Sequence, residues 1–141
     1  LSLSTQASWI SAHTRANGPG DEDGDGVADD ANGKRIPQVP PLTTVTRLAW
    51  QGRTWDATLT HRFVGRQALQ SDRNNDQRFL DPYHDFGLSV GVRPRENWEI
   101  RANAENLLDR EYITRGIDAF GGPFFNPAGR MNWSGSVTYR F

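Results

Sequence analysis

The amino-acid sequence predicts an all-β protein, in which about six strands form part of an antiparallel, up-and-down transmembrane β-barrel. Apolar and polar side chains alternate along six segments, and the connections between these segments are alternately short and long. The tryptophans lie near the segment ends. Because successive side chains of a strand point to opposite faces, a wall between lipid and water needs such alternation.

Each predicted strand is defined by its own alternation. In chain order, the segments run from Leu1 to Thr14, Leu42 to Trp50, Trp55 to Phe63, Tyr83 to Val92, Trp98 to Glu105 and Met131 to Phe141. The residues predicted to face lipid are Leu1, Leu3, Ala7 and Trp9; Leu42, Leu48 and Trp50; Trp55, Ala57, Leu59 and Phe63; Phe86, Leu88, Val90 and Val92; Trp98, Ile100, Ala102 and Ala104; and Met131, Trp133, Val137, Tyr139 and Phe141. His61 is a polar exception in this series, and the parity is ambiguous at Asn106-Leu107.

The overall composition fits a membrane wall. Mean hydropathy is -0.71, and no apolar run approaches the ~18 residues of a membrane helix. A barrel wall has low mean hydropathy because every second residue faces water. The formal net charge of -1, without a basic stripe carrying interleaved aromatics, gives no reason to expect nucleic acid as a partner. The chain has no cysteine, which excludes disulfides and thiol chemistry.

The connections give a second, independent signal. Gln51-Gly52-Arg53 and Pro94 to Asn97 are hairpin-sized and contain turn residues. The other three connections are long, running from Arg15 to Val39, Gln67 to Pro82 and Ile113 to Ala128. Outer-membrane barrels have short periplasmic turns and longer extracellular loops. We therefore expect the three long connections to lie outside the cell.

The tryptophans favour a membrane wall over a soluble β-sandwich. All five fall on the predicted lipid face near strand ends, at Trp9, Trp50, Trp55, Trp98 and Trp133. Indole rings prefer the headgroup layer, so these residues would form two belts. A sandwich core with the same aromatics is the alternative, but such a core places its largest residues in mid-strand. Segments of ~10 residues also match a tilted bilayer crossing.

Residues near the end of the chain resemble a known family. The stretch from Ala104 to Tyr112 is AENLLDREY, the stretch from Pro127 to Arg130 is PAGR, and the chain ends in VTYRF. This combination is similar to the C-terminal signature of TonB-dependent outer-membrane receptors, in which the penultimate strand ends in Asn-Leu-Phe-Asp-x-x-Tyr and the last begins near Gly-Arg and finishes in Phe. The matching positions are Asn106, Leu107, Asp109, Tyr112, Gly129 and Arg130, with Leu108 in place of the usual Phe.

The resemblance implies an architecture, a location and partners. The chain would be the C-terminal part of a barrel that has twenty-two strands in this family, in the bacterial outer membrane, with the plug domain and the TonB box outside residues 1–141. The implied partners are the lipid bilayer, the plug domain of the same parent chain, the TonB energy-coupling complex, the outer-membrane assembly machinery and a small-molecule ligand. Val137, Tyr139 and Phe141 would be recognised by the assembly machinery.

An acidic segment stands apart from the strands. Asp21, Asp23, Asp25 and Asp29 occupy relative positions 1, 3, 5 and 9 of a calcium-binding loop, with glycine at position 6. Position 12 is Asn32, where a strong EF-hand has a bidentate Glu, so the expected Ca²⁺ affinity is modest. The alternative is a solvated acidic loop that binds nothing specific. No other cofactor is predicted.

The remaining charged residues indicate a wall rather than a catalytic site. Those predicted to face the lumen, as a solvated or plug-contacting network, are Arg47, Asp56, Arg62, Asp85, Glu99, Arg101, Glu105 and Arg140. The three histidines, His13, His61 and His84, lack the spacing of zinc or haem ligands. No nucleophile is accompanied by a base and an orienting group, so the protein is not predicted to be an enzyme.

Two functions follow from these observations. The first, which the resemblance implies, is active uptake of a scarce ligand, most often a ferric siderophore, by a TonB-dependent receptor. The second is a passive outer-membrane pore, or a barrel that displays adhesive loops. A plug domain and an energy-coupling box upstream would decide for active import.

Overall fold

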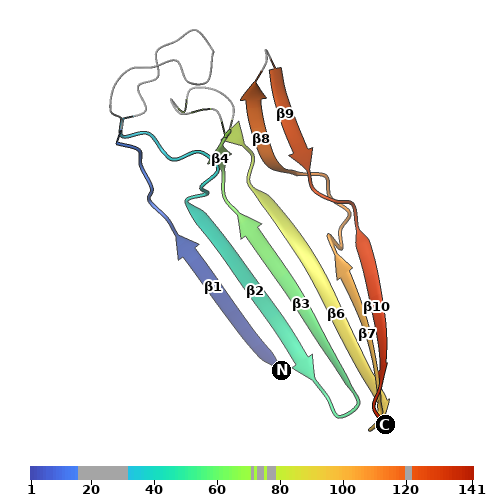
Figure 1. Ribbon diagram of the computed structural model, residues 1–141. Helices are drawn as coiled ribbons and strands as arrows, with labels where there is room; N and C mark the ends of the chain where they lie inside the picture. The colour runs from blue at the N-terminus through green and yellow to red at the C-terminus, as the bar shows by residue number, and fades with distance from the viewer. Residues whose placement is uncertain (16–31, 71, 73–74, 76–78, 120–121) are drawn as a thin grey trace.

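The computed structural model describes residues 1–15, 32–70, 72, 75, 79–119 and 122–141. These residues form strands β1 (Ser2–Trp9), β2 (Leu42–Gln51), β3 (Trp55–Val64), β4 (Gln67–Ala68), β5 (Phe79–Leu80), β6 (Tyr83–Arg95), β7 (Trp98–Glu105), β8 (Ile113–Ala119), β9 (Gly122–Pro127) and β10 (Asn132–Tyr139). Six of them make one antiparallel sheet in the order β1-β2-β3-β6-β7-β10, which is not closed into a barrel (Figure 1). Within this part of the chain, no helix is both long and apolar enough to cross a membrane.

The strand register confirms the predicted alternation. Leu48 on β2 pairs with Leu59 on β3, and Leu59 pairs with Leu88 on β6. The complete row across the six strands is Leu3, Leu48, Leu59, Leu88, Ala104 and Trp133. The neighbouring row, on the opposite face, contains Thr58, Ser89, Asn103 and Ser134. One face of the wall is therefore apolar and the other polar, as the sequence predicts.

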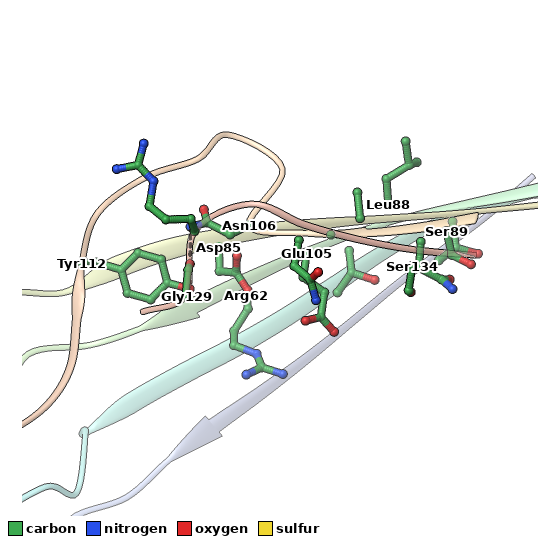
Figure 2. A pocket seen from close by; sticks show the side chains of 16 residues that line it. Arg62, Asp85, Leu88, Ser89, Glu105, Asn106, Tyr112, Gly129 and Ser134 are labelled. Atoms are coloured by element: carbon green, nitrogen blue, oxygen red, sulfur yellow. Dashed lines mark hydrogen bonds between the residues drawn. The ribbon is translucent and has the colours of Figure 1, made fainter. Parts of the chain in front are cut away.

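The polar face is the concave one. A hollow of about 620 Å³ lies on it, with Thr58 and Ser89 among its lining residues (Figure 2). Large apolar side chains of the other face remain exposed, including Leu59, Val92 and Ile100. An outward apolar surface and an inward polar hollow are the arrangement of a membrane barrel wall around an aqueous lumen.

Aromatic rings gather at the rim with the short turns. Trp50 and Trp55 flank the β2–β3 turn with ring centroids 3.7 Å apart. Trp98 on β7 lies 5.0 Å from Tyr139 on β10, which is its register partner. These contacts place three of the five tryptophans at one rim of the apolar face, as expected of an interfacial belt.

The first strand is shorter than the alternation predicts. The sequence suggested a strand to Thr14, whereas β1 ends at Trp9, which pairs with Leu42 at the start of β2. Pro41 precedes that position. Its carbonyl accepts a bond from the N–H of Ile10 at 3.0 Å, but Pro41 has no N–H with which to donate a bond in return. The ladder stops there, and the chain then makes a single antiparallel bridge between His13 and Arg35.

The second short turn is tighter than predicted. Pro94 and Arg95 belong to β6, and Arg95 pairs with Trp98, which leaves two residues in the turn. The register shifts between Val92 and Arg95. Proline cannot donate to a ladder and is tolerated at such an irregularity, which explains why Pro94 extends the strand instead of ending it.

The outer connections contain strands that the sequence did not predict. Residues 67–82 include the short pair β4 and β5, and residues 113–128 form the hairpin of β8 and β9 (Figure 1). The Gly121-Gly122-Pro123 run within this connection was an available turn signal. The described parts of both connections therefore contain strands above the wall, at the end opposite the short turns.

Among the described residues, the largest fully buried side chains, Leu69 and Asp72, lie in these outer connections. Leu69 is completely buried, and a Cβ on Gly116 of β8 would come within 2.6 Å of its Cδ2 atom. The N–H of Gln70 donates to the carbonyl of Gly116 at 2.8 Å, and the N–H of Gln38 donates to the carbonyl of Ala68 at 3.1 Å. The described parts of the three long connections thus contact one another, and we name this packed unit the outer cap (residues 34–38, 67–70, 72, 75 and 113–119).

Candidate functional site

Strand β7 ends in a turn built from residues that tolerate left-handed backbone. Asn106 has φ 46° and Asp109 has φ 48°. Asparagine and aspartate are the non-glycine residues most often found in this region. The N–H of Asp109 donates to the carbonyl of Asn106 at 2.8 Å, which closes the turn directly after Glu105. This turn resolves the parity that was ambiguous at Asn106-Leu107.

The Asn106 side chain links the end of β7 to the segment that precedes β10. It is 5% exposed, and its amide donates to the carbonyls of Arg110 at 2.8 Å and Gly129 at 2.9 Å. Its oxygen accepts the N–H of Arg110 at 3.0 Å. A buried amide with all three bonds made is favourable, whereas a replacement that leaves these backbone groups unpaired costs about 1–3 kcal/mol.

An ion pair makes the second connection between the same segments. Arg130 donates to both carboxylate oxygens of Asp109, from Nε at 3.0 Å and from Nη2 at 2.7 Å, and it also contacts Glu111. The N–H of Met131 donates to Asp109 at 2.9 Å. This backbone bond and the Arg130 guanidinium lower the pKa of Asp109, and Asp109 in turn raises the pKa of Arg130.

These contacts bring the family-motif residues together. We name the group the clasp, and it consists of Asn106, Asp109, Tyr112, Gly129 and Arg130. The carbonyl of Tyr112 accepts the N–H of Ala128 at 2.8 Å, so the clasp encloses the base of the β8–β9 hairpin. Leu107 takes part through its N–H, which donates to the carbonyl of Phe86 at 2.8 Å, while the Leu108 side chain is 52% exposed.

The clasp borders the polar hollow at its outer end. Tyr112, Asp85 and Arg62 lie there, while Ser89 and Ser134 lie further along the wall (Figure 2). Tyr83 stacks on Tyr112 with ring centroids 4.2 Å apart. Partial burial raises the pKa of Tyr112, and the charge of Asp85 raises it further. One buried carboxylate oxygen of Asp85 makes no hydrogen bond within the described residues. This end of the hollow therefore offers a carboxylate, a guanidinium and a phenol to a polar partner.

A charge network occupies the polar face near the short turns. Asp56 accepts from Arg93 at 2.6 Å and from Arg101 at 3.2 Å. Glu99 pairs with Arg101 at 3.1 Å and with Arg140 at 3.7 Å. The sequence placed four of these five residues on the lumenal face but missed Arg93, although its parity along β6 pointed the same way. For Arg47 and Glu105, no ion pair is found within the described residues.

The structure describes the predicted assembly residues but not the predicted calcium ligands. Val137 pairs with Ile100, and Tyr139 pairs with Trp98 on the apolar face. Phe141 lies beyond the end of β10, with its ring edge-on to Tyr139 at 5.1 Å. The proposed calcium ligands Asp21, Asp23, Asp25 and Asp29 lie outside the described residues. Within those residues, no group of three or more His, Asp or Glu side chains is arranged to hold a metal.

The outer cap contains the contacts that sequence reasoning missed. Gln67 is buried and donates to the carbonyl of Thr114 at 3.2 Å, and Gln38 donates from its side chain to the carbonyl of Gly116 at 3.3 Å. Asn75 accepts the N–H of Arg35 at 2.7 Å and donates to its carbonyl at 3.1 Å. No periodic pattern marks such side-chain bonds to distant backbone.

A curved antiparallel wall with an apolar convex face, a polar concave face and long connections at one rim defines the class of outer-membrane β-barrels. Comparison with protein families matches residues 1–107 to the TonB dependent receptor-like β-barrel family. The chain belongs to this family, whose members are receptors and transporters of the Gram-negative outer membrane rather than enzymes. Comparison with curated proteins gives no match.

Solved structures with a similar fold include receptors for siderophores. The siderophore receptor PiuA from Acinetobacter baumannii matches 97% of this chain with a TM-score of 0.77 and 16% identity. The ferric yersiniabactin uptake receptor FyuA from Yersinia pestis matches 81% with a TM-score of 0.64 and 23% identity. The ferric-catecholate import receptor Fiu from E. coli K12 matches 89% with a TM-score of 0.62 and 15% identity. This chain spans 19%, 18% and 17% of their respective lengths.

Proposed function

We propose that the chain is the C-terminal part of a receptor that imports a ferric siderophore by TonB-driven movement of a plug domain. Family membership supports TonB coupling, and the solved structures of similar fold include siderophore receptors. The proposed partners of the parent protein are its own plug domain, the TonB complex, the assembly machinery and the ligand.

The outer cap is the observation that carries this proposal. Leu69 packs against Gly116, and Gln38 bonds to Ala68 and Gly116 of the other two connections, so the described parts of the three connections form one supported surface above the lumenal hollow. A surface fixed in this way can hold binding groups in a defined arrangement.

Uptake in living cells tests the proposal. Cells that produce the parent protein are given a labelled ferric siderophore, with and without a functional TonB protein. We expect binding in both strains and uptake only in the TonB-containing strain, because binding needs no energy source. Equal uptake in the two strains would support the passive pore instead. Absence of binding to every iron chelate tested would remove iron as the cargo.

A further inference from the structure

Two histidines contact each other on the apolar, outward face of the wall. Nε2 of His61 on β3 lies 2.9 Å from Nδ1 of His84 on β6. The ring planes are 9° apart and the ring centroids are separated by 5.2 Å. The two residues are far apart in sequence, and only the pairing of β3 with β6 brings their imidazoles together.

The surrounding wall holds both rings in position. In the register, His61 is opposite Phe86 and Phe63 is opposite His84. The Phe86 ring lies 4.7 Å from the His61 ring, and the Phe63 ring lies 4.9 Å from the His84 ring. Two hydrogen-bonded strands and two aromatic neighbours thus fix the imidazoles, so little ordering remains to be done when a ligand binds.

The distance between the two nitrogens suits a metal ion. In the neutral pair, one of these nitrogens carries the shared proton and the other accepts it. If His61 instead carries its proton on Nδ1 and His84 carries its proton on Nε2, the lone pairs of the two facing nitrogens are both free for a metal ion between them. At metal–nitrogen distances of about 2.0–2.1 Å, two ligands at a right angle are about 2.9 Å apart, and two at the tetrahedral angle about 3.3 Å. The observed separation needs at most a small widening.

We propose that His61 and His84 form a binding site for a divalent transition-metal ion, of the kind that prefers imidazole ligands, such as Cu²⁺, Ni²⁺ or Zn²⁺. The ion takes the place of the shared proton, which moves to the other nitrogen of the same ring, and it links β3 to β6. Oxygen atoms of water or of lipid headgroups complete its coordination.

The position of the pair gives oxygen ligands access to it. His84 lies eight positions along β6 from Val92, which pairs with Trp55 of the aromatic rim. At about 3.3 Å per residue and a tilt near 45°, His84 is roughly 19 Å from the aromatic rim along the membrane normal. Since the apolar band is about 25 Å tall, the pair is closer to the outer edge of that band than to the rim with the short turns. His84 is also exposed.

Copper binding to the purified parent protein in detergent tests the site. We compare wild type with His61→Asn and His84→Asn, and use His13→Asn as the matched control, because His13 is the third histidine of this chain and lies away from the pair. Wild type and the control are expected to bind one more equivalent of Cu²⁺ than either pair variant. Electron paramagnetic resonance should show nitrogen ligation that both pair variants lose. Equal stoichiometry and equal spectra in all four proteins would overturn the proposal.

A measurement on the unaltered protein covers the case in which a variant fails to fold. Imidazoles are modified with diethyl pyrocarbonate in the presence and absence of Zn²⁺, and each histidine is quantified by mass spectrometry. Zn²⁺ should slow the modification of His61 and His84 at least tenfold and leave His13 unchanged. Equal rates with and without Zn²⁺ at all three residues would mean that the histidines only bond to each other.

Discussion

At the rim with the short turns, charged side chains pair directly across neighbouring strands, whereas at the outer rim the contacts join connections far apart in sequence. Asp56 meets Arg93 and Arg101 simply because β3, β6 and β7 are adjacent. Leu69 meets Gly116 because two separate connections fold onto each other. The contacts at the rim with the short turns thus follow from strand register, while those at the outer rim depend on a few particular residues. We expect substitutions in the barrel wall to have larger effects than substitutions in the outer connections.

The largest effect is expected at the end of β10. Deleting Phe141 from the parent protein should abolish assembly, because the resemblance assigns this residue to recognition by the assembly machinery. The variant should accumulate as protease-sensitive material without the heat-modifiable migration of a folded barrel. Phe141→Tyr, which keeps an aromatic ring, should assemble. Normal assembly of the deletion variant would contradict the prediction.

The next effect concerns the two faces of the wall. Leu59→Arg should destabilise the barrel by ~2–4 kcal/mol, because the charge would face the middle of the bilayer. Thr58→Arg, one residue away on the polar face, should have a much smaller effect. Denaturant unfolding of the parent protein in lipid vesicles measures both. Equal losses would show that the faces are wrongly assigned.

A smaller and local effect is expected in the outer cap. Gly116→Val should cost about 1–3 kcal/mol in local stability, because the new side chain would overlap Leu69 and Phe125. Gly122→Val is the control, since nothing lies within 4 Å of a Cβ added there. Limited proteolysis should detect faster cleavage of residues 67–82 in the first variant only. Cleavage at the wild-type rate would mean that the three connections do not support one another.

The smallest effect is a pH dependence in the clasp. Because the pKa of Asp109 is lower in the folded protein, its contribution to stability is present above about pH 4 and is lost as the pH falls through the folded-state value. Asp109 and Arg130 are solvated, so the effect is modest and weakens in salt. The difference between wild type and Asp109→Asn in urea midpoint should shrink between pH 7 and pH 3. A constant difference would assign the effect to packing.

The wall could be predicted from sequence because its signal is local. Alternation with a period of two needs only neighbouring residues, and the row through Leu48, Leu59 and Leu88 follows from it once the hairpins are placed. The same logic located the lumenal charges. The predicted end of the first strand was wrong, because β1 ends at Trp9, where its partner strand β2 begins after a proline. The alternation within one strand carries no information about where the partner strand begins.

The outer rim was predictable only in part. Resemblance singled out the residues of the clasp, but not the bonds of the Asn106 amide, which depend on where Arg110 and Gly129 come to lie. The burial of Leu69 had no periodic signal, because it depends on a meeting between connections whose order in space the alternation does not encode. The contact between His61 and His84 depends instead on the exact register of β3 against β6.

The clasp has a consequence for how such receptors diversify. The amide of Asn106 and the pair formed by Asp109 and Arg130 close the base of the β8–β9 hairpin, so the register between β7 and β10 is set below that hairpin. Insertions, deletions or exchanges beyond the base then leave the barrel wall undisturbed. Sequence change can therefore accumulate in the β8–β9 hairpin while the membrane-embedded part stays constant, and the clasp marks the boundary at which this hairpin can be exchanged between receptors.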